Sequence, residues 1–494
     1  MPQSHIILRW IAGVWCARDV DTVFERLSLI GHRLGRYDRA SVPYRFEGMM
    51  SRFMVNNLPI EMFALWLLEL ALSYYLALAL LSSGAAAAGL GVPLANQAFF
   101  IALAVVSTAF LVGLYRPAVF ARTRSMLVNT ALGGVMAFPA AWLVSSALGI
   151  DAARIVGQGW LWPAKILAVW ILALFVTRLT FLAAVRSNLF VRRVAMLGDP
   201  ATMAPTVTAI TAAQAGFITI AAGPSLEADP ASLRRAAVSD LVATRSALAA
   251  MTPTERAAFA SAGVSIETEA QFWERHLKRV DIAAIGPEWV AEIDQNAGGR
   301  LQAAVIRVGD VLVSGAMLIF TAPLMGIVAA AVRLDSSGPV LYRQERVGLG
   351  NVPFTLLKFR SMQINAERAG PAWATTSDPR VTRIGGIIRR TRMDELPQLF
   401  NILAGQMSFI GPRPERPHFV EKLSSVIPYY GERARVKPGL TGWAQVNFPY
   451  GASVEDARVK LSYDLFYVKH RSVLLDMGIM FATIRVILFQ EGAR

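Results

Sequence analysis

The sequence predicts a membrane protein of the α+β class, and three observations lead to this prediction. Four long apolar stretches lie within residues 61–185, short apolar runs alternate with helix-like segments in 190–298, and a fifth long apolar stretch occupies 303–334. We therefore expect four N-terminal transmembrane helices, a small parallel α/β domain, a re-entrant membrane helix and an α-rich C-terminal domain over 335–494.

Length, composition and charge limit this organisation. A chain of 494 residues is too long for one core, and its 54% hydrophobic content with a mean hydropathy of +0.43 favours membrane segments. The net charge of +14 favours acidic partners such as anionic lipid, nucleic acid or phosphorylated substrates. The single cysteine, Cys16, excludes a disulfide or a cysteine-based zinc site within one chain, and residues 1–60 predict a basic cytoplasmic segment without a cleaved signal peptide.

Four apolar stretches approach the ~20 residues that a bilayer-spanning helix needs. They are Met62–Ser82, Ala98–Leu114, Met126–Leu148 and Leu161–Val176. Arginines are frequent before the first stretch, after the second and after the fourth, which Arg178, Arg186, Arg192 and Arg193 follow. The connection 83–97 carries no charge. This alternation predicts that both ends of the four-helix unit lie in the cytoplasm.

Residues 190–298 have a different pattern. "RRVAMLGD", "GFITIAAG", "SDLVATR" and "VDIAAIG" predict short strands, and segments such as "PTERAAFASAG" between them predict helices. A dinucleotide site would require G-x-G-x-x-G after the first strand, but only Gly198 is present and Pro200 follows it. We therefore expect a degenerate Rossmann-like α/β domain without a nucleotide fingerprint, with a regulatory or scaffolding role.

The fifth apolar stretch has 22 residues without formal charge between Asp310 and Arg333. A plain fifth span is one interpretation. Basic residues on both sides of the stretch argue against it, because a spanning helix should show charge asymmetry. Pro323 lies in its second half and removes a backbone hydrogen bond. We expect a re-entrant hairpin that breaks at Pro323, with Arg307 and Asp310 at the membrane interface.

Two adjacent carboxylates stand out in the C-terminal region. Asp394 and Glu395 lie in "TRMDELPQLFN", just before Pro397 and among many arginines. Taken alone, this stretch suggests a helix start with Asp394 as the N-cap. The arginines at 389, 390 and 392 suggest a membrane-facing basic patch. The last apolar stretch, "VLLDMGIMFATIRVILF", predicts a helix on or partly in the membrane.

The C-terminal blocks together carry a specific resemblance. "LKFRSM", "RTRMDELPQLFN", "FIGPRPE", "KPGLTGWAQVN" and "YDLFYVKH" occur in order within residues 303–490. They closely resemble the bacterial sugar transferase family, the monotopic polyprenol-phosphate phosphoglycosyltransferases. Residues 60–300 more loosely resemble the long-form members, which initiate exopolysaccharide or O-antigen assembly as hexose-1-phosphate transferases.

The resemblance implies a reaction and a set of site residues. A sugar-1-phosphate would pass from a UDP-sugar to undecaprenyl phosphate with release of UMP, through a covalent phosphosugar-aspartyl intermediate. Asp394 would be the nucleophile and would help to hold Mg²⁺, and Glu395 would serve in positioning and proton transfer. The diphosphate contacts map onto Lys358, Arg389 and Arg413, and a substrate-facing loop maps onto Lys437, Thr441, Trp443 and Gln445. Cations suit this role because the diphosphate adds negative charge to a carboxylate nucleophile.

The resemblance also implies a location in the bacterial inner membrane, as a multi-pass protein with its catalytic domain on the cytoplasmic face. Membrane lipid would be a partner and a homodimer stays open, whereas nucleic acid is not expected. Three positions depart from the family pattern: Ile306-Arg307 replaces Lys-Arg, Ala322-Pro323 replaces Ser-Pro, and Asn447-Phe448-Pro449-Tyr450 replaces Asn-Gly.

Other functions remain as alternatives. The chain is either this enzyme, an inactive membrane scaffold or regulator of polysaccharide assembly, a glycosyltransferase that releases UDP, or a basic nucleic-acid binder. The last lacks a recognisable module with interleaved aromatic and basic residues. The sequence does not identify the sugar.

Overall fold

The structure is a computed structural model of the chain. It describes residues 60–87, 95–111, 114–115, 123–147, 161–186, 191–213, 218–225, 227–296, 299–364, 379–448, 451 and 453–489. Apart from Ile60, the basic segment expected at residues 1–60 lies outside the described residues. The remaining chain is a mixture of helices and small sheets, which agrees with the expected α+β class.

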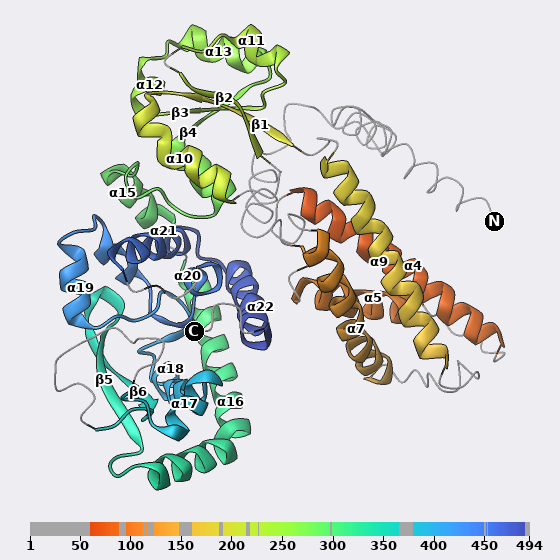
Figure 1. Cartoon of the computed structure of the whole chain (residues 1–494), viewed down its shortest axis with the longest axis vertical. Helices are drawn as coiled ribbons and strands as arrows, with labels where there is room; N and C mark the ends of the chain where they lie inside the picture. The colour runs from red at the N-terminus through yellow and green to blue at the C-terminus, as the bar shows by residue number, and fades with distance from the viewer. Residues whose placement is uncertain are drawn as a thin grey trace. The chain divides into compact units, whose positions relative to one another are not determined.

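Four apolar helices coincide with the four long apolar stretches. They are α4 (Ile60–Ala87), α5 (Ala95–Leu111), α7 (Thr123–Ala147) and α9 (Leu161–Arg186). Consecutive helices pack against one another, and α9 also packs against α4 (Figure 1). Many large apolar side chains on their outer faces are exposed, including Leu143, which is 70% exposed, and Leu172, which is 63% exposed. An apolar outer surface of this kind suits lipid better than water.

Length and composition separate these helices. Segments of α4 and α7 are long and apolar enough to cross a membrane, as is the helix Arg300–Asp335 described below. The apolar parts of α5 and α9, at Ala95–Phe110 and Ala168–Ala184, are shorter. The chain therefore has the helices of a membrane-associated protein.

A buried ion pair joins α4 to α9. The helix α9 continues past Val176, where we expected it to end, so Arg178 lies inside the bundle and not in a cytoplasmic connection. Its guanidinium donates to Glu69 at 2.9 Å, and both side chains are 0% exposed. Tyr115 and Thr177 also donate to Glu69, at 2.6 and 3.1 Å. We call Glu69, Tyr115, Thr177 and Arg178 the bundle cluster.

A four-stranded parallel sheet follows the bundle. Its order is β2-β1-β3-β4, from strands β1 (Arg192–Leu197), β2 (Ile218–Ser225), β3 (Asp240–Ala243) and β4 (Ser265–Thr268). The helices of this region are α10 (Pro200–Ala213), α11 (Pro230–Arg235), α12 (Arg245–Ala250) and α13 (Pro253–Ser261). The expected helix in "PTERAAFASAG" is α13, which starts with a capping box between Thr252 and Glu255. The parallel α/β layer expected here is present.

One expected strand is wrong. "VDIAAIG", residues 280–286, is irregular, and the fourth strand is the more polar segment "SIET" of β4. The apolar residues of this segment serve another core. Val280, Ile282 and Ile285 are buried with residues from 410–479, and not in the sheet. The elements around them are α14 (Glu269–Phe272), the π-helix η1 (Trp273–Leu277) and α15 (Pro287–Asn296).

The C-terminal region is built on the long helix α16 (Arg300–Asp335). An antiparallel hairpin joins β5 (Leu341–Val347) to β6 (Pro353–Phe359), with the short helix η2 (Leu349–Asn351) between them. A parallel pair joins β7 (Ser408–Ile410) to β8 (Gly439–Thr441). The helices are α17 (Arg383–Arg390), η3 (Met393–Glu395), α18 (Gln398–Leu403), α19 (Pro417–Ser424), η4 (Tyr430–Arg435), α20 (Trp443–Asn447), α21 (Val454–His470) and α22 (Val473–Phe489).

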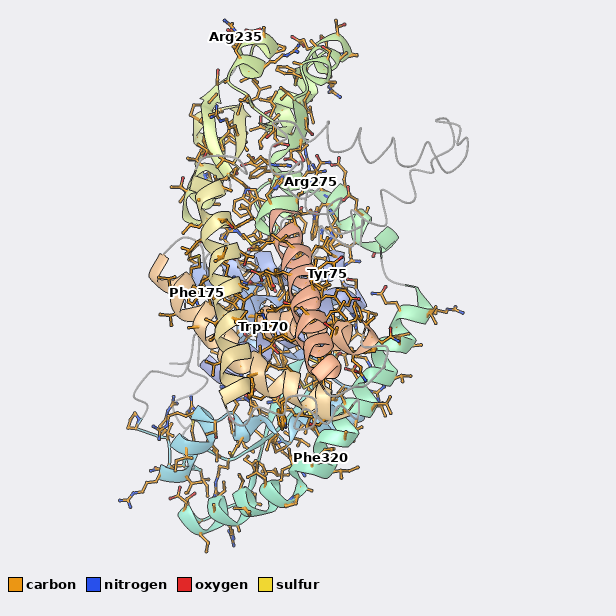
Figure 2. The ribbon with its side chains drawn as sticks, turned by 90° about the vertical axis from the view of Figure 1, so that its right-hand side faces the viewer. Tyr75, Trp170, Phe175, Arg235, Arg275 and Phe320 are labelled. Atoms are coloured by element: carbon orange, nitrogen blue, oxygen red, sulfur yellow. The ribbon has the colours of Figure 1, made fainter. Side chains whose placement is uncertain are left out.

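The break expected at Pro323 is wrong, because the helix α16 is continuous through this residue, although its axis bends (Figure 1). The Thr321 hydroxyl donates to the carbonyl of Met317 at 2.7 Å, an interaction that, like an internal proline, favours bending. Phe320, labelled in Figure 2, is 83% exposed on this helix. Arg307 and Asp310 face the protein: Arg307 donates to the carbonyls of Ile402 and Leu403, and Asp310 is buried against β7.

Candidate active site

The two adjacent carboxylates lie in a single turn of 3-10 helix. This turn, η3, connects α17 to α18, and Asp394 does not cap α18, because Pro397 occupies the N-cap position with helical backbone angles. The interpretation of the stretch as an ordinary helix start is therefore wrong. Arg392 precedes the turn with φ 59°, in the left-handed region that non-glycine residues rarely adopt. Such backbone strain is concentrated at functional sites.

Three cations surround Glu395. Lys358, near the end of β6, donates to its Oε1 at 3.2 Å, and Arg413, in the loop after β7, donates to the same atom at 2.8 Å. Arg392 lies 3.9 Å from this oxygen. Burial opposes ionisation of Glu395, but Arg413 and Lys358 outweigh it and hold the pKa of this carboxyl well below its usual range. Glu395 therefore stays ionised.

The surroundings of Asp394 differ from those of Glu395. Asp394 is 8% exposed, and its carboxylate accepts no hydrogen bond from any residue that the structure describes. Burial raises the pKa of Asp394, and the negative charge of Glu395 raises it further against the opposing effect of Lys358. A more basic carboxylate without hydrogen bonds is a stronger nucleophile than an ordinary one. We call Asp394, Glu395, Lys358, Arg392 and Arg413 the dyad cluster.

The other residues expected at the site lie further from the dyad. Arg389 is in the last turn of α17, half-buried, and within the described part of the chain no hydrogen bond connects its side chain to either carboxylate. Trp443 packs on Phe466 and donates from its indole N–H to the carbonyl of Lys278 at 2.8 Å. Gln445 donates to the carbonyl of Leu440 at 3.1 Å. Their roles in substrate binding stay predictions.

Lys437 and Thr441 lie on the α16 and α22 sides of the expected substrate loop. The Thr441 hydroxyl is 2.7 Å from that of Thr483 on α22. Burial and the neighbouring Arg307 lower the pKa of Lys437, while Asp310 opposes this change. The structure therefore brings Lys358 and Arg413 to the dyad. Lys437 and Thr441, by contrast, lie among other protein groups.

The backbone of this loop supports the segment that carries Arg413. Gly411 donates to the carbonyl of Thr441 at 2.9 Å, and Gly439 donates to that of Pro412 at 2.9 Å. A Cβ atom at Gly411 would overlap with the carbonyl of Lys437, so only glycine permits this approach. The loop "KPGLTGWAQVN" thus holds "GPRP" in place.

Sequence reasoning did not identify several residues that support Arg413. Arg346 on β5 donates to the carbonyl of Pro414 at 2.9 Å, and Arg433 on η4 donates to that of Arg413 at 3.0 Å. Asp464 on α21 pairs with Arg433 at 2.7 Å. Asp464 lies in the quoted block "YDLFYVKH", but its spacing from "GPRP" carries no information about their contact.

The acidic residues provide a limited set of metal ligands. Among the residues that the structure describes, no group of three His, Cys, Asp or Glu side chains could hold a metal ion. One or two carboxylates completed by substrate phosphates and water are the usual surroundings of Mg²⁺. The free carboxylate of Asp394 fits such an arrangement.

Comparison with known proteins agrees with the position of this site. The model of the family described as bacterial sugar transferase matches residues 301–490. A protein of Aeromonas hydrophila named UDP-N-acetylgalactosamine-undecaprenyl-phosphate N-acetylgalactosaminephosphotransferase is 42% identical over 240 residues, which are 45% of this chain and 57% of the relative. Undecaprenyl-phosphate glucose phosphotransferase of Komagataeibacter xylinus is 44% identical over 193 residues, which are 38% of this chain and 36% of the relative.

A further relative, from Caulobacter vibrioides, is named UDP-glucose:undecaprenyl-phosphate glucose-1-phosphate transferase. It is 40% identical over 189 residues, which are 38% of this chain and 71% of the relative. The chain spans 57% of the first relative and 36% of the second. The matched segment contains the whole dyad cluster. This chain therefore belongs to the bacterial sugar transferase family.

Proposed function

We propose that this chain transfers a sugar-1-phosphate from a UDP-sugar to undecaprenyl phosphate and releases UMP, as an initiating step of polysaccharide assembly. The contrast between the two adjacent carboxylates carries this proposal. Glu395 binds the cations, whereas the carboxylate of Asp394 beside them accepts no hydrogen bond from the residues that the structure describes. The names of the relatives support the donor and acceptor classes.

In the proposed reaction, an oxygen of Asp394 attacks the phosphorus that carries the sugar. A bond forms between this oxygen and phosphorus, and the bond to the UMP oxygen breaks, so UMP leaves with its electron pair. An oxygen of undecaprenyl phosphate then attacks the same phosphorus and releases the Asp394 carboxylate. Lys358, Arg392 and Arg413 offset the charge that a diphosphate brings to a carboxylate nucleophile.

Glu395 has a positioning role in this proposal. Its oxygen accepts from both Lys358 and Arg413 and so holds two cations at one point. Its pKa lies well below the usual range, so it is a poor proton acceptor near neutral pH. This favours the positioning role over the proton-transfer role that the resemblance also implied.

We propose Mg²⁺ as the cofactor, held by Asp394 and the substrate phosphates. When bound, Mg²⁺ would neutralise diphosphate charge and assist departure of the UMP oxygen. The chain's own residues supply one carboxylate for it and three nearby cations for the remaining phosphate oxygens.

We also propose a multi-pass arrangement in the inner membrane, with α4, α5, α7 and α9 spanning it and α16 re-entrant. Both ends of α16 contact the same C-terminal region: Asp310 accepts from Phe409 near its start, and Asp335 accepts from Ile384 at its end. Contacts of both ends with one region favour a helix that does not cross the bilayer. The site would then face the cytoplasm, where nucleotide sugars are made. We also propose a homodimer, which mass photometry of the purified protein would test by measuring the mass of the particles.

The test uses the full chain in nanodiscs with Mg²⁺ and undecaprenyl phosphate. UDP-glucose, UDP-galactose and their N-acetylated counterparts are supplied separately, and UMP and UDP are measured. We expect UMP from a preferred donor, dependent on the lipid. Without the lipid, we expect a burst of up to one UMP per enzyme and a sugar-phosphate mass on the peptide that contains Asp394. UDP release, or no product from folded protein, would contradict the proposal.

A further inference from the structure

The guanidinium of Arg413 has few contacts of its own among the described residues. It is 37% exposed, and among the described residues one hydrogen bond, to Glu395 at 2.8 Å, holds it. Most of its five N–H donors are therefore free for phosphate oxygens. The position of this group depends on where the backbone of residues 412–414 is held.

Carbonyl groups hold this backbone. Pro412 and Pro414 restrict φ on both sides of Arg413 and have no N–H to donate. The carbonyl of Arg413 accepts from Arg433 at 3.0 Å, and that of Pro414 accepts from Arg346 at 2.9 Å. Two half-buried arginines therefore hold this segment through its carbonyl groups.

Arg433 is held in turn by α21 and η4. Its guanidinium donates to Asp464 at 2.7 Å and to the Tyr430 hydroxyl at 2.9 Å. The side chain of Asp464 is 3% exposed, that of Arg433 is 12% exposed, and the Arg433 Nε is buried without an acceptor among the described residues. A buried ion pair with an unsatisfied donor is a costly arrangement, and stability alone does not favour it over apolar residues.

We propose that Asp464 is a positioning residue for the transfer reaction: through Arg433 it fixes the carbonyl of Arg413 and thereby the guanidinium that faces Glu395 and the diphosphate. This inference rests on the proposed function. Asp464 contacts neither Asp394 nor Glu395 in the described structure, so it acts only through Arg433. A displacement of about 1 Å in a positioned group lowers rates by about 100-fold, which sets the scale of the effect.

The contact of Asp464 with Arg433 and the raised pKa of Asp464 together predict a pH dependence of kcat. Burial raises the pKa of Asp464 to about 6. The opposing effect of Arg433 lowers this pKa, Glu415 adds to the increase, and Lys460 adds to the decrease. Tyr430 is the other titratable side chain to which Arg433 donates among the described residues. Protonation near pH 6 weakens the hold on Arg433, so we expect a component of the acid limb of kcat near this pH.

The test compares Asp464→Asn with wild type in nanodiscs, with UDP-glucose and UDP-N-acetylgalactosamine as probes. We expect kcat to fall about 10- to 100-fold, KM for the donor to change less than about threefold, and the component near pH 6 to disappear. The matched control is Asp240→Asn, because Asp240 is a similarly buried aspartate that pairs with an arginine, Arg192, in the α/β sheet. The control should keep wild-type kcat and pH profile.

Wild-type kcat and an unchanged pH profile in Asp464→Asn would overturn the inference. A decrease in kcat by the same factor at every pH would overturn it as well. If this variant does not fold, Arg433→Lys replaces it: a similar loss of kcat with a small change in KM supports the inference, and wild-type kcat overturns it. The proposed function fails separately, because then the wild-type protein itself would release no UMP from either donor.

Discussion

The bundle cluster and the dyad cluster both contain a carboxylate paired with an arginine, yet they differ in exposure. Glu69 and Arg178 are 0% exposed, and hydroxyl groups and a backbone carbonyl complete their contacts. Around Glu395, by contrast, Lys358, Arg392 and Arg413 are 17%, 54% and 37% exposed. A closed network without access for a ligand stabilises a bundle, whereas an open one with excess cations is able to bind an anion.

The comparison teaches that a buried ion pair is not by itself evidence of a site. In the bundle cluster, Tyr115, Thr177 and Arg178 all donate to Glu69. In the dyad cluster, the cations converge on Glu395, and no hydrogen bond from the described part of the chain reaches the adjacent Asp394. The unused carboxylate, and not the ion pair, distinguishes the site.

The largest expected effect is at this unused carboxylate. Asp394→Asn should lower the rate of UMP release on the order of 10⁴-fold, because the amide cannot form the covalent intermediate. Thermal unfolding should change little, since the carboxylate makes no hydrogen bond in the described structure. A variant that retains a tenth of the wild-type rate would exclude Asp394 as the nucleophile.

The same type of change in the bundle cluster should have the opposite signature. Glu69→Ala leaves Arg178 buried without its carboxylate and should lower the free energy of unfolding by about 3–5 kcal/mol. UMP release per folded molecule should stay at the wild-type level. Denaturant unfolding in detergent measures the first quantity and the nanodisc assay the second.

The matched control for this prediction is the double variant Glu69→Leu with Arg178→Met. Because both charges are removed together, it should recover most of the lost stability. A Glu69→Ala protein that is stable but inactive would contradict the distinction between the two clusters.

A smaller effect concerns the pH dependence of the dyad cluster. Burial and the charge of Glu395 raise the pKa of Asp394, and Lys358 and Arg413 lower it. In Glu395→Gln, one raising contribution disappears and the two cations are no longer neutralised, so the pKa of Asp394 should fall. The acid limb that reflects Asp394 should move to lower pH, with a reduced maximal rate because the nucleophile is less basic. An acid limb that moves to higher pH would show that Glu395 does not raise this pKa.

The smallest effect tests the backbone of the open cluster. Arg392→Gly and Arg392→Ala remove the same cation, but only glycine adopts φ 59° without strain. The alanine variant should therefore be less stable than the glycine variant by about 1 kcal/mol. Both should lose the same activity at saturating donor, and equal stability of the two would argue against strain at this residue.

Several elements were predictable because local pattern decides them. Apolar stretches predicted the four helices of the bundle, and short apolar runs between helix-like segments predicted three of the four strands of the sheet. The strand expected at 280–286 failed because apolar composition does not say which core a segment joins. We expected Arg178 outside the bundle, because a charged residue is rare inside an apolar helix. Its partner Glu69 lies on a distant segment of the chain, so the sequence did not show that the two charges pair.

By itself, the sequence determined the order of the segments, the apolar character of the membrane-associated helices and, through its motifs, Asp394 and Glu395 as the candidate dyad. Only the tertiary structure decided that Lys358 and Arg413 meet at Glu395, because they come from β6 and the loop after β7, whose contacts depend on packing, whereas Arg392 is near Glu395 in the sequence. It also decided that Arg433 and Asp464 support Arg413 from behind. Spacing along a chain specifies local geometry, whereas charge interactions depend on distance in space.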